Sequence, residues 1–562
     1  MGDTEVLVVG AGPVGLTAAA ELRRRGVECR IVDRLPAPQP YAKAVGIQPR
    51  TLEVWDAMGL VREVLDEAVP MRGQLIFVNG DPGPRIDLDL PADVPYRFAA
   101  LPQYTTERLL TDHLAGYGTT VERGTELLDL EQRDDHVRVS LATPDGPREA
   151  AARYVVGCDG AHSRVRRAAG IAFEGDAFPE QYMLGDVEVD WDLPDGYGVR
   201  ATHLDADGVA DDLLVCIPLP GRRRYRMSML VPPELASAPS GEVAHGLERG
   251  RAPELRHIQA VLDRLSPQPT TATALRWSSV FRISHRLADR YREGRLLLAG
   301  DAAHIHPPTG AQGMNTGVQD AYNLAWKLAL AVRGIAADGL LDSYHAERHA
   351  VGEEVVGRTV RHARAGFDAD PDDLTTLLLR EAQLLVGYRG GPLTPPGGGA
   401  GDPGGGHGPL AGDRAPDCGG LERPLTAFPQ RLFDLLRSPR HALLLYADAG
   451  TPAERLHGTA AAARSAAHGL LDVHVVLAAG ADSRPDGLRL PYVRDAAGAF
   501  RAAYAPGDGA RDGADAGTGA GAAFLIRPDG YLAARLPAGD PGGPAAELRR
   551  AFAAPGATGS TA

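Results

Sequence analysis

The sequence predicts an α/β protein of several domains, and three observations lead to that prediction. A short apolar strand, residues 5–9, runs directly into a glycine-rich turn and an Ala/Leu helix. Segments in the middle of the chain show the alternation of apolar and polar residues that is typical of antiparallel strands. After a Gly/Pro tract at 388–409, apolar strands alternate with Ala-rich helical stretches. With 562 residues, the chain is long enough for roughly three or four domains of average size.

The first element is a βαβ unit of the Rossmann type at residues 5–33. Its turn, Gly10-Ala11-Gly12-Pro13-Val14-Gly15, has the G-x-G-x-x-G spacing and opens a helix expected over 16–25. Gly10 permits the tight turn, Gly12 lets a pyrophosphate approach the backbone, and Gly15 lets helix and strand pack closely. The phosphate would then lie at the helix N-terminus, where free N–H groups point at it.

Acidic residues follow three apolar strands. Asp33 ends the second strand of the first unit, Asp159-Gly160 follows the strand at 152–157, and Gly300-Asp301 follows the strand at 295–299. In open α/β sheets, ligands bind outside the carboxyl ends of the strands. The pattern at Asp159 and Asp301 therefore predicts a ligand site at the strand ends, and Asp33 is placed to accept from the ribose hydroxyls of a nucleotide.

The remaining elements set the expected domain boundaries. Residues 309–316 are Gly-rich and nearly free of bulky side chains, which would let backbone amides approach a flat ligand. A helix with one buried stripe is expected from Asp320 to about Arg333, followed by helical residues 335–385. The dinucleotide-binding domain is expected to comprise residues 1–73, 98–181 and 286–387, an inserted and mainly antiparallel β domain residues 74–97 and 182–285, a linker residues 388–409, and a C-terminal α/β domain residues 410–555.

Composition narrows the class of protein. The net charge is −14 and no dense Lys/Arg block occurs, which argues against nucleic acid as a partner. The four cysteines are far apart and form no C-x-x-C, so neither a disulfide framework nor a metal site is expected. No secretory segment and no run of 18 apolar residues is visible, and we expect a cytoplasmic protein without a membrane span.

Three signatures in this order, roughly 145 residues apart, carry a resemblance. The turn 10–15, the stretch Cys158-Asp159-Gly160-Ala161-His162-Ser163-Arg164-Val165-Arg166 and the stretch 300–315 together resemble the flavin-dependent aromatic hydroxylases of the p-hydroxybenzoate hydroxylase fold. Residues 412–416 and 527–530 resemble the thioredoxin-like domain that is appended to phenol hydroxylase and to hydroxylases of aromatic polyketide biosynthesis. Without C-x-x-C, this domain is expected to be structural or dimer-forming. Truncation after Gly390 would then leave the flavin bound but alter the oligomeric state.

The resemblance implies a bound FAD. Its contacts would come from Gly10, Gly12, Pro13, Gly15, Asp33, Arg34, Lys43, Gln103, Asp159, Asp301, Pro308, Gly310, Gly313, Met314 and Asn315. Asp301 would bond the ribityl chain, and residues 310–315 would present amides to the pyrimidine edge of the flavin. Lys43 stands where relatives usually carry an arginine near the pyrophosphate, which keeps the charge but loses the bidentate fork.

The resemblance also implies an activity. In a single-component flavoprotein monooxygenase of class A, NAD(P)H, with NADPH favoured, reduces FAD, and O2 then forms a flavin C4a-hydroperoxide that transfers oxygen to a polycyclic aromatic carbon. Two other outcomes remain open: Baeyer–Villiger or drug-inactivating (rifampicin-like) oxygenation, and an oxidase or dehydrogenase reaction. A flavin-binding interaction protein is a third, non-enzymatic alternative. The small-molecule substrate and the choice between monomer and homodimer stay undefined.

No catalytic base follows from the sequence. Some relatives use an acid near Val45 or a tyrosine near Phe281, and neither is present here. His304, Arg282 and Pro308 are the candidates that remain. His304 could instead pack behind the flavin, bonded to backbone. Pro307-Pro308 would wall the flavin face next to the substrate, and Trp277 and Phe281 fit a pocket wall.

Overall fold

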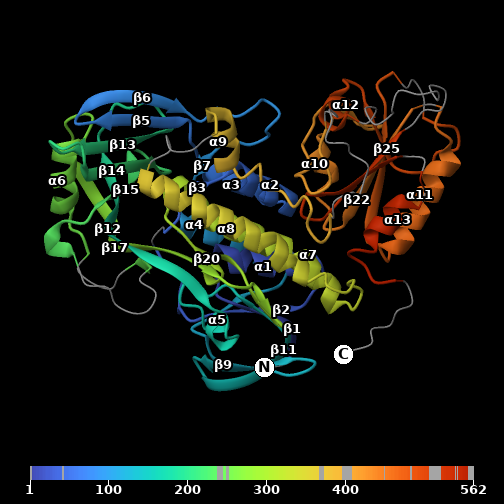
Figure 1. Cartoon of the computed structure of the whole chain (residues 1–562), viewed down its shortest axis with the longest axis horizontal. Coiled ribbons are helices and arrows are strands. Elements are labelled where there is room, and N and C mark those ends of the chain that lie inside the picture. Colours follow the sequence, from blue (N-terminus) through green and yellow to red (C-terminus); the bar gives the residue numbers. More distant parts are fainter. Residues whose placement is uncertain are drawn as a thin grey trace.

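The computed structural model describes residues 3–40, 43–236, 245–247, 252–365, 372–394, 408–448, 450–480, 484–505, 521–537, 540 and 542–554. Three large sheets organise these residues (Figure 1). The first lies below the long helices α7 and α8, the second at the left of the view, and the third, in orange and red, at the right. The predicted mixed α/β class is confirmed.

The first sheet carries the N-terminal βαβ unit. In spatial order its strands are β18 (Arg292–Glu293), β19 (Leu296–Leu298), β11 (Gly146–Gly157), β1 (Thr4–Val9), β2 (Cys29–Asp33) and β8 (Val121–Arg123). Off this path, β10 (Val137–Thr143) pairs with β11, and β9 (Glu126–Gln132) pairs with β10. The run β19-β11-β1-β2-β8 is parallel, so the carboxyl ends of these strands meet at one edge. Helices α1 (Pro13–Arg24), α4 (Gln103–Gly116) and α7 (Gln312–Val332) pack on this sheet and its core.

Two helices begin earlier than the sequence predicts. Helix α1 starts at Pro13 rather than residue 16, because a proline at the first helical position has no N–H to lose and has a helical φ. Helix α7 starts at Gln312, eight residues before Asp320, so the open stretch expected over 309–316 is shorter than predicted. Buried hydrogen bonds of Gln312 and Asn315 stabilise this first turn against the low helix propensity of its glycine.

The second sheet is mainly antiparallel, as predicted. Its strands in order are β16 (Gly246–Leu247), β17 (Ala272–Ala288), β12 (Phe173–Val189), β15 (Arg224–Leu230), β14 (Ala210–Pro218), β13 (Tyr197–Leu204), β5 (Gly73–Val78) and β6 (Asp81–Asp87), and β20 (His304–Ile305) also pairs with β17. The pair β13–β5 is parallel. Helix α6 (Leu255–Leu265) covers one face. Strands β12 and β17 run past the expected boundaries at 182 and 285, and the division into domains stays a prediction.

A small additional sheet and several helices, among them the long α8, connect these two sheets. They are β3 (Gly46–Ile47), β4 (Val69–Pro70) and β7 (Ala99–Ala100), which form a small sheet, and α2 (Pro49–Met58), α3 (Val61–Glu67), α5 (Arg164–Ala168), α8 (Asp342–Ala365), α9 (Leu374–Glu381), η1 (Pro233–Leu235), η2 (Gly300–Ala302) and η3 (Thr309–Ala311). Helices α8 and α9 cover most of the described part of the helical region predicted at 335–385, whereas residues 335–341 are not helical.

The third sheet forms the C-terminal α/β region. Its order is β21 (Leu421–Glu422), β24 (Tyr492–Asp495), β23 (Leu471–Leu477), β22 (His441–Ala447), β25 (Ala522–Ile526) and β26 (Leu532–Pro537), with helices α10 (Leu432–Leu435), α11 (Ala453–Ala466), α12 (Ala499–Tyr504) and α13 (Gly543–Leu548). The four cysteines are free, and burial raises the pKa of the Cys418 thiol to about 12. The likeness to thioredoxin stays a prediction. Of the expected linker, residues 395–407 lie outside the described residues.

A buried ion cluster joins the C-terminal region to the rest of the chain. Arg527 donates to both oxygens of Glu347 at 2.6 and 2.8 Å, and Lys327 Nζ donates to Glu347 Oε2 at 2.7 Å. Asp529 pairs with Arg527 and accepts from Trp326 Nε1 at 3.0 Å. These charged side chains are at most 1% exposed. The 527–530 motif therefore completes the core around α7 and α8.

Two buried carboxylates predict how stability depends on pH. Burial alone raises the pKa of Glu21 and of Glu347, but neighbouring cations, Arg24 and Arg25 for the first and Arg527 and Lys327 for the second, lower each pKa to about 2. Because the unfolded value is 4.5, their stabilisation is present above pH 4.5 and is lost as the pH falls from 4.5 towards 2.

We expect each carboxylate to contribute roughly 3 kcal/mol to the free energy of unfolding above this window. Urea unfolding measured from pH 6 to about 3 should show this loss. The variants E21Q and E347Q should be less stable at neutral pH and lose less stability on acidification. A wild-type free energy of unfolding that does not change over this range would contradict the assignment.

Candidate cofactor site

The glycine turn between β1 and α1 has the geometry that the sequence predicts. Gly10 has a φ of +100°, and a Cβ added to it would lie 2.3 Å from the carbonyl oxygen of Cys158. A Cβ on Gly15 would lie 1.9 Å from the Gly10 carbonyl oxygen. A Cβ on Gly12 would meet no atom within 4 Å. Gly10 and Gly15 are thus needed for packing, whereas Gly12 leaves open space at the N-terminus of α1, which fits a phosphate-bearing cofactor.

This contrast predicts that G12V folds but loses FAD. The valine side chain would occupy the space at the helix N-terminus, whereas G15V would overlap the Gly10 backbone and prevent folding. Purified G12V should show the wild-type circular dichroism spectrum. Its flavin-to-protein ratio should fall below about one tenth of the wild-type value, because the valine removes phosphate contacts of the cofactor. Wild-type flavin content in G12V would rule out the pyrophosphate position.

Asp33 and its neighbours close the other side of the turn. Asp33 Oδ2 accepts from the Ala11 N–H at 2.8 Å, and Asp33 Oδ1 accepts from the Leu35 N–H at 2.8 Å. Arg34 is exposed beside this carboxylate, and Pro13 is the first residue of α1. The strand-end acid therefore holds the turn in place while it lies at the edge where the ribose is expected.

Lys43 and Asp301, which are far apart in the sequence, form an ion pair. Lys43 Nζ lies 2.6 Å from Asp301 Oδ2, and both side chains are 33% exposed. Burial by itself raises the pKa of Asp301, but the Lys43 ammonium and His245 hold it below its usual range. Gln103 supports this region, because its Oε1 accepts from the Ala44 N–H at 2.9 Å. A cation and an anion are thus held together at the carboxyl edge of the sheet.

The Asp159 carboxylate accepts hydrogen bonds from a backbone N–H and a serine hydroxyl. Its Oδ2 accepts from the Arg164 N–H at 2.6 Å, and its Oδ1 accepts from the Ser163 hydroxyl at 2.5 Å, which anchors the N-terminus of α5. Arg166 donates from this short helix to the carbonyl oxygen of Ala302 at 2.8 Å. The second and third signatures are therefore physically connected, and the connection is next to Asp301.

The predicted flavin turn lies against β3. Gly310 and Ala311 have φ values of +71° and +55°, and a Cβ on Gly46 would lie 2.5 Å from the Ala311 Cβ. Asn315 fixes this approach, since its Nδ2 donates to the carbonyl oxygens of Gly46 at 3.0 Å and Ala311 at 2.7 Å. Around it, Pro308 is exposed, Met314 packs partly buried on the core, and Gly313 faces the His306 ring.

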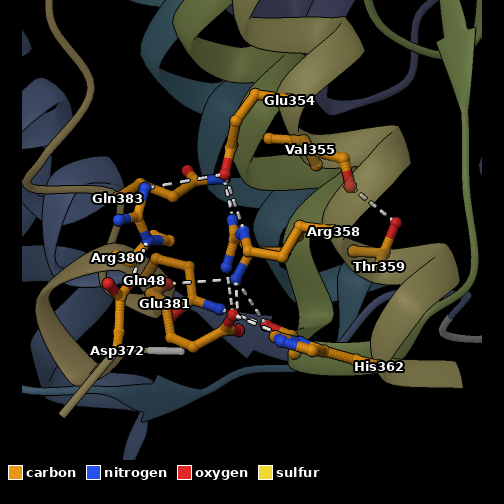
Figure 2. Close-up of polar contacts among 12 residues, drawn as sticks. Gln48, Glu354, Val355, Arg358, Thr359, His362, Asp372, Arg380, Glu381 and Gln383 are labelled. Atoms are coloured by element: carbon orange, nitrogen blue, oxygen red, sulfur yellow. Dashed lines mark hydrogen bonds and ion pairs between the residues drawn. The ribbon is translucent and has the colours of Figure 1, made fainter. Parts of the chain in front are cut away.

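Glu381, at the end of α9, was not predicted and contacts this turn (Figure 2). Glu381 Oε2 accepts from Gln312 Nε2 at 2.8 Å and would lie 2.0 Å from a Cβ on Gly310. Arg358 of α8 forms an ion pair with Glu381, and Gln48 Nε2 donates to the Gly310 carbonyl oxygen at 2.5 Å. Burial raises the pKa of Glu381, although Arg358 opposes this. The sequence holds no signal for this contact, because a glutamate at a helix end is usually solvated.

His304 belongs to a buried network. Its Nε2 lies 2.7 Å from Asp320 Oδ2, and Asp320 also binds Arg348 Nε at 2.7 Å and accepts from the Gly300 N–H at 3.1 Å. The His304 side chain is 1% exposed. Its partner is a carboxylate and not the backbone, so the histidine connects β20 and α7 to the loop that carries Asp301.

Arg282 lies away from the residues expected to wall the pocket. Successive residues of a strand point to opposite faces, so Arg282 and Phe281 point to opposite faces of β17. Phe281 is buried with Leu184 and Ile283, and Trp277 packs on this cluster.

The described residues contain no group of three or more His, Cys, Asp or Glu side chains that could hold a metal ion. Within the same residues, no helix is both long and apolar enough to cross a membrane.

Comparisons with known proteins agree with this geometry. Residues 3–359 match the family model described as FAD binding domain. A flavin-dependent monooxygenase of Mycobacteroides abscessus is 34% identical over 78% of this chain and 88% of its own length, and a 6-methylpretetramide 4-monooxygenase of Streptomyces rimosus is 35% identical over 80% of both chains. The crystal structure of aklavinone-11 hydroxylase with FAD and aklavinone has a TM-score of 0.70 at 25% identity, over 95% of this chain and 96% of that one.

These matches confirm the resemblance that the three signatures carry, and they confirm FAD as the cofactor. The chain belongs to the FAD-binding-domain family, and within it to the flavin-dependent monooxygenases of aromatic and polyketide compounds.

Proposed function

We propose that the chain uses NADPH and O2 to insert one oxygen atom into a polycyclic aromatic substrate. The observation that carries this proposal is that three distant segments meet at one edge: the open turn at Gly12, the Lys43–Asp301 pair and the Gly310–Asn315 turn. An elongated dinucleotide with a flat ring at one end would contact all three. The relative named as a 6-methylpretetramide 4-monooxygenase and the hydroxylase whose structure holds aklavinone support a polycyclic aromatic substrate.

Each segment has its own role in the proposal. Lys43 neutralises the pyrophosphate, and Asp301 accepts from the ribityl hydroxyls. The turn at 310–315 donates backbone N–H groups to the pyrimidine edge, and Glu381 and Asn315 hold that turn from either side. The bound FAD supplies activation of oxygen, while the inserted sheet excludes water from the reacting face.

The test combines two measurements on the FAD-loaded enzyme. When the enzyme is mixed anaerobically with NADPH and no aromatic compound is present, the flavin band should bleach slowly. With one member of a panel of polycyclic phenols and quinones, it should bleach at least about tenfold faster, as substrate-gated reduction requires. With labelled O2, the product should carry one labelled oxygen atom. A product with an unchanged ring count indicates hydroxylation, and ring expansion indicates a Baeyer–Villiger reaction. Hydrogen peroxide without labelled product would identify an oxidase.

A further inference from the structure

A buried ion pair lies in the middle of the inserted sheet. Arg226 Nε on β15 donates to Asp186 Oδ1 on β12 at 2.5 Å, and the two residues are 4% and 2% exposed. The Arg226 guanidinium carbon lies 5.0 Å from the ring centroid of Trp277. Arg226 Nη2 is buried and has no hydrogen-bond acceptor among the described residues. A buried pair adds little stability, and a buried donor without an acceptor is unfavourable, so the arrangement calls for a function.

The pair points away from helix α6. A Cβ on Gly185 would lie 2.5 Å from Ile258 of α6, so Gly185 faces that helix. Asp186 is the next residue of the strand and faces the other side. Arg226 and Trp277 are its direct partners on the two neighbouring strands, and cross-strand partners share a face. The three side chains therefore form one row on the face opposite α6.

Both ends of this row lead to the candidate cofactor site. At one end, Ile217 is the cross-strand partner of Arg226 and packs in an apolar cluster with Val45. Val45 directly precedes Gly46, which contacts the turn at Gly310 and Ala311. At the other end, Phe281 lies on the same face as Trp277, and its ring centroid is 5.5 Å from that of His245. His245 in turn is close enough to Lys43 and Asp301 for their charges to act on it. This face of the sheet is thus turned towards the residues assigned to FAD.

We propose that Arg226 binds an anionic oxygen of the aromatic substrate, a phenolate or an enolised carbonyl, through its free Nη2. Asp186 and Trp277 position the guanidinium for this contact. A guanidinium that donates to the ionised oxygen favours the phenolate, which is the electron-rich form needed for attack on an oxygen donor. This explains how the site works without an acid at Val45 or a tyrosine at Phe281. The inference rests on the proposed function, because it requires an aromatic substrate on this face.

The test compares R226M and R226K with a matched control, R276M. Arg276 forms an ion pair with Glu188 at 2.8 Å between the same two strands β17 and β12, but it is exposed. The probes are a dihydroxyanthraquinone and its dimethyl ether, which differ only in the acidic hydroxyls. The dissociation constant is read from the perturbation of the flavin absorption band in the FAD-loaded enzyme, and thermal unfolding confirms that each variant is folded.

We expect R226M to raise the dissociation constant of the dihydroxy compound about tenfold or more and that of the dimethyl ether less than about twofold, because a charge-assisted hydrogen bond is lost only with the former. R226K should give an intermediate loss, and R276M none. Equal effects on both probes, or no effect on either, would overturn the role of Arg226. Failure of the wild-type enzyme to bind any polycyclic phenol would overturn the proposed function together with it.

Discussion

Replacing Asp301 by alanine is expected to give a folded protein that no longer retains FAD. The carboxylate lies at the carboxyl edge of the parallel sheet, 2.6 Å from Lys43, and the Lys43 ammonium, against the effect of burial, holds its pKa below the usual range, so the ionised form is favoured. Removing it abolishes a charge-assisted contact to the cofactor and leaves Lys43 without its partner. Loss of such a contact weakens binding about ten- to hundredfold.

The measurement is the flavin-to-protein absorbance ratio after gel filtration, followed by titration with FAD. D301N should fall between wild type and D301A, because the amide still bonds a hydroxyl but carries no charge. D289A, which removes an exposed partner of Arg290, serves as the control and should retain wild-type flavin content. Stoichiometric flavin in purified D301A would remove Asp301 from the cofactor site.

The variant R527M is expected to lose stability across the whole chain and not only in the C-terminal region. It leaves the carboxylates of Glu347 and Asp529 buried, with Lys327 as the one remaining cation that contacts Glu347 in the described cluster. Breaking a buried pair by removing one partner costs about 3–5 kcal/mol. Chemical denaturation, followed by both flavin release and circular dichroism, should show both transitions at lower denaturant concentration.

The control is R550M, which removes the exposed Arg550 from its pair with the half-buried Glu547 and should change the free energy of unfolding by less than about 1 kcal/mol. If R527M lowers the midpoint of the circular dichroism transition while the midpoint of flavin release stays at the wild-type value, the C-terminal region and the rest of the chain unfold independently. The buried cluster also changes the expectation for truncation after Gly390. Without residues 527 and 529, the side chains of Lys327 and Glu347 lose their buried partners, and the apolar surface around them becomes exposed to solvent. We therefore expect the truncated chain to bind FAD poorly or to aggregate.

The local signatures could be predicted from sequence because their chemistry is contained in a few neighbouring residues. The turn at Gly10, Gly12 and Gly15 depends on a strand, a helix and three missing side chains, and all of these are visible in one short stretch. The strands at 471–477 and 523–526 are equally clear from sequence. The first alternates apolar residues with Asp472 and His474 and ends in an apolar run, and the second is apolar throughout. In both cases the pattern and the structure rest on the same short-range physics.

The contacts that hold the site together could not be predicted, because they join residues that are distant in the chain. Glu381 reaches the turn at Gly310 from another helix, and its sequence context resembles an ordinary solvated helix end. The sequence makes His304 a candidate base, but its hydrogen bond to Asp320 depends on how α7 packs against η2. The early start of α7 has the same origin, since tertiary hydrogen bonds outweigh local propensity.

The ion cluster around Glu347 has a consequence for protein engineering. One way to build a chimera of two related monooxygenases is to exchange whole modules at a linker, here the Gly/Pro tract at 388–409. A crossover at that point would separate Arg527 and Asp529 from Lys327, Trp326 and Glu347, whose side chains meet in one desolvated contact. A viable hybrid must therefore inherit both halves of the cluster from one parent. The proposed substrate face of the inserted sheet, opposite α6, holds none of these residues and can be changed separately.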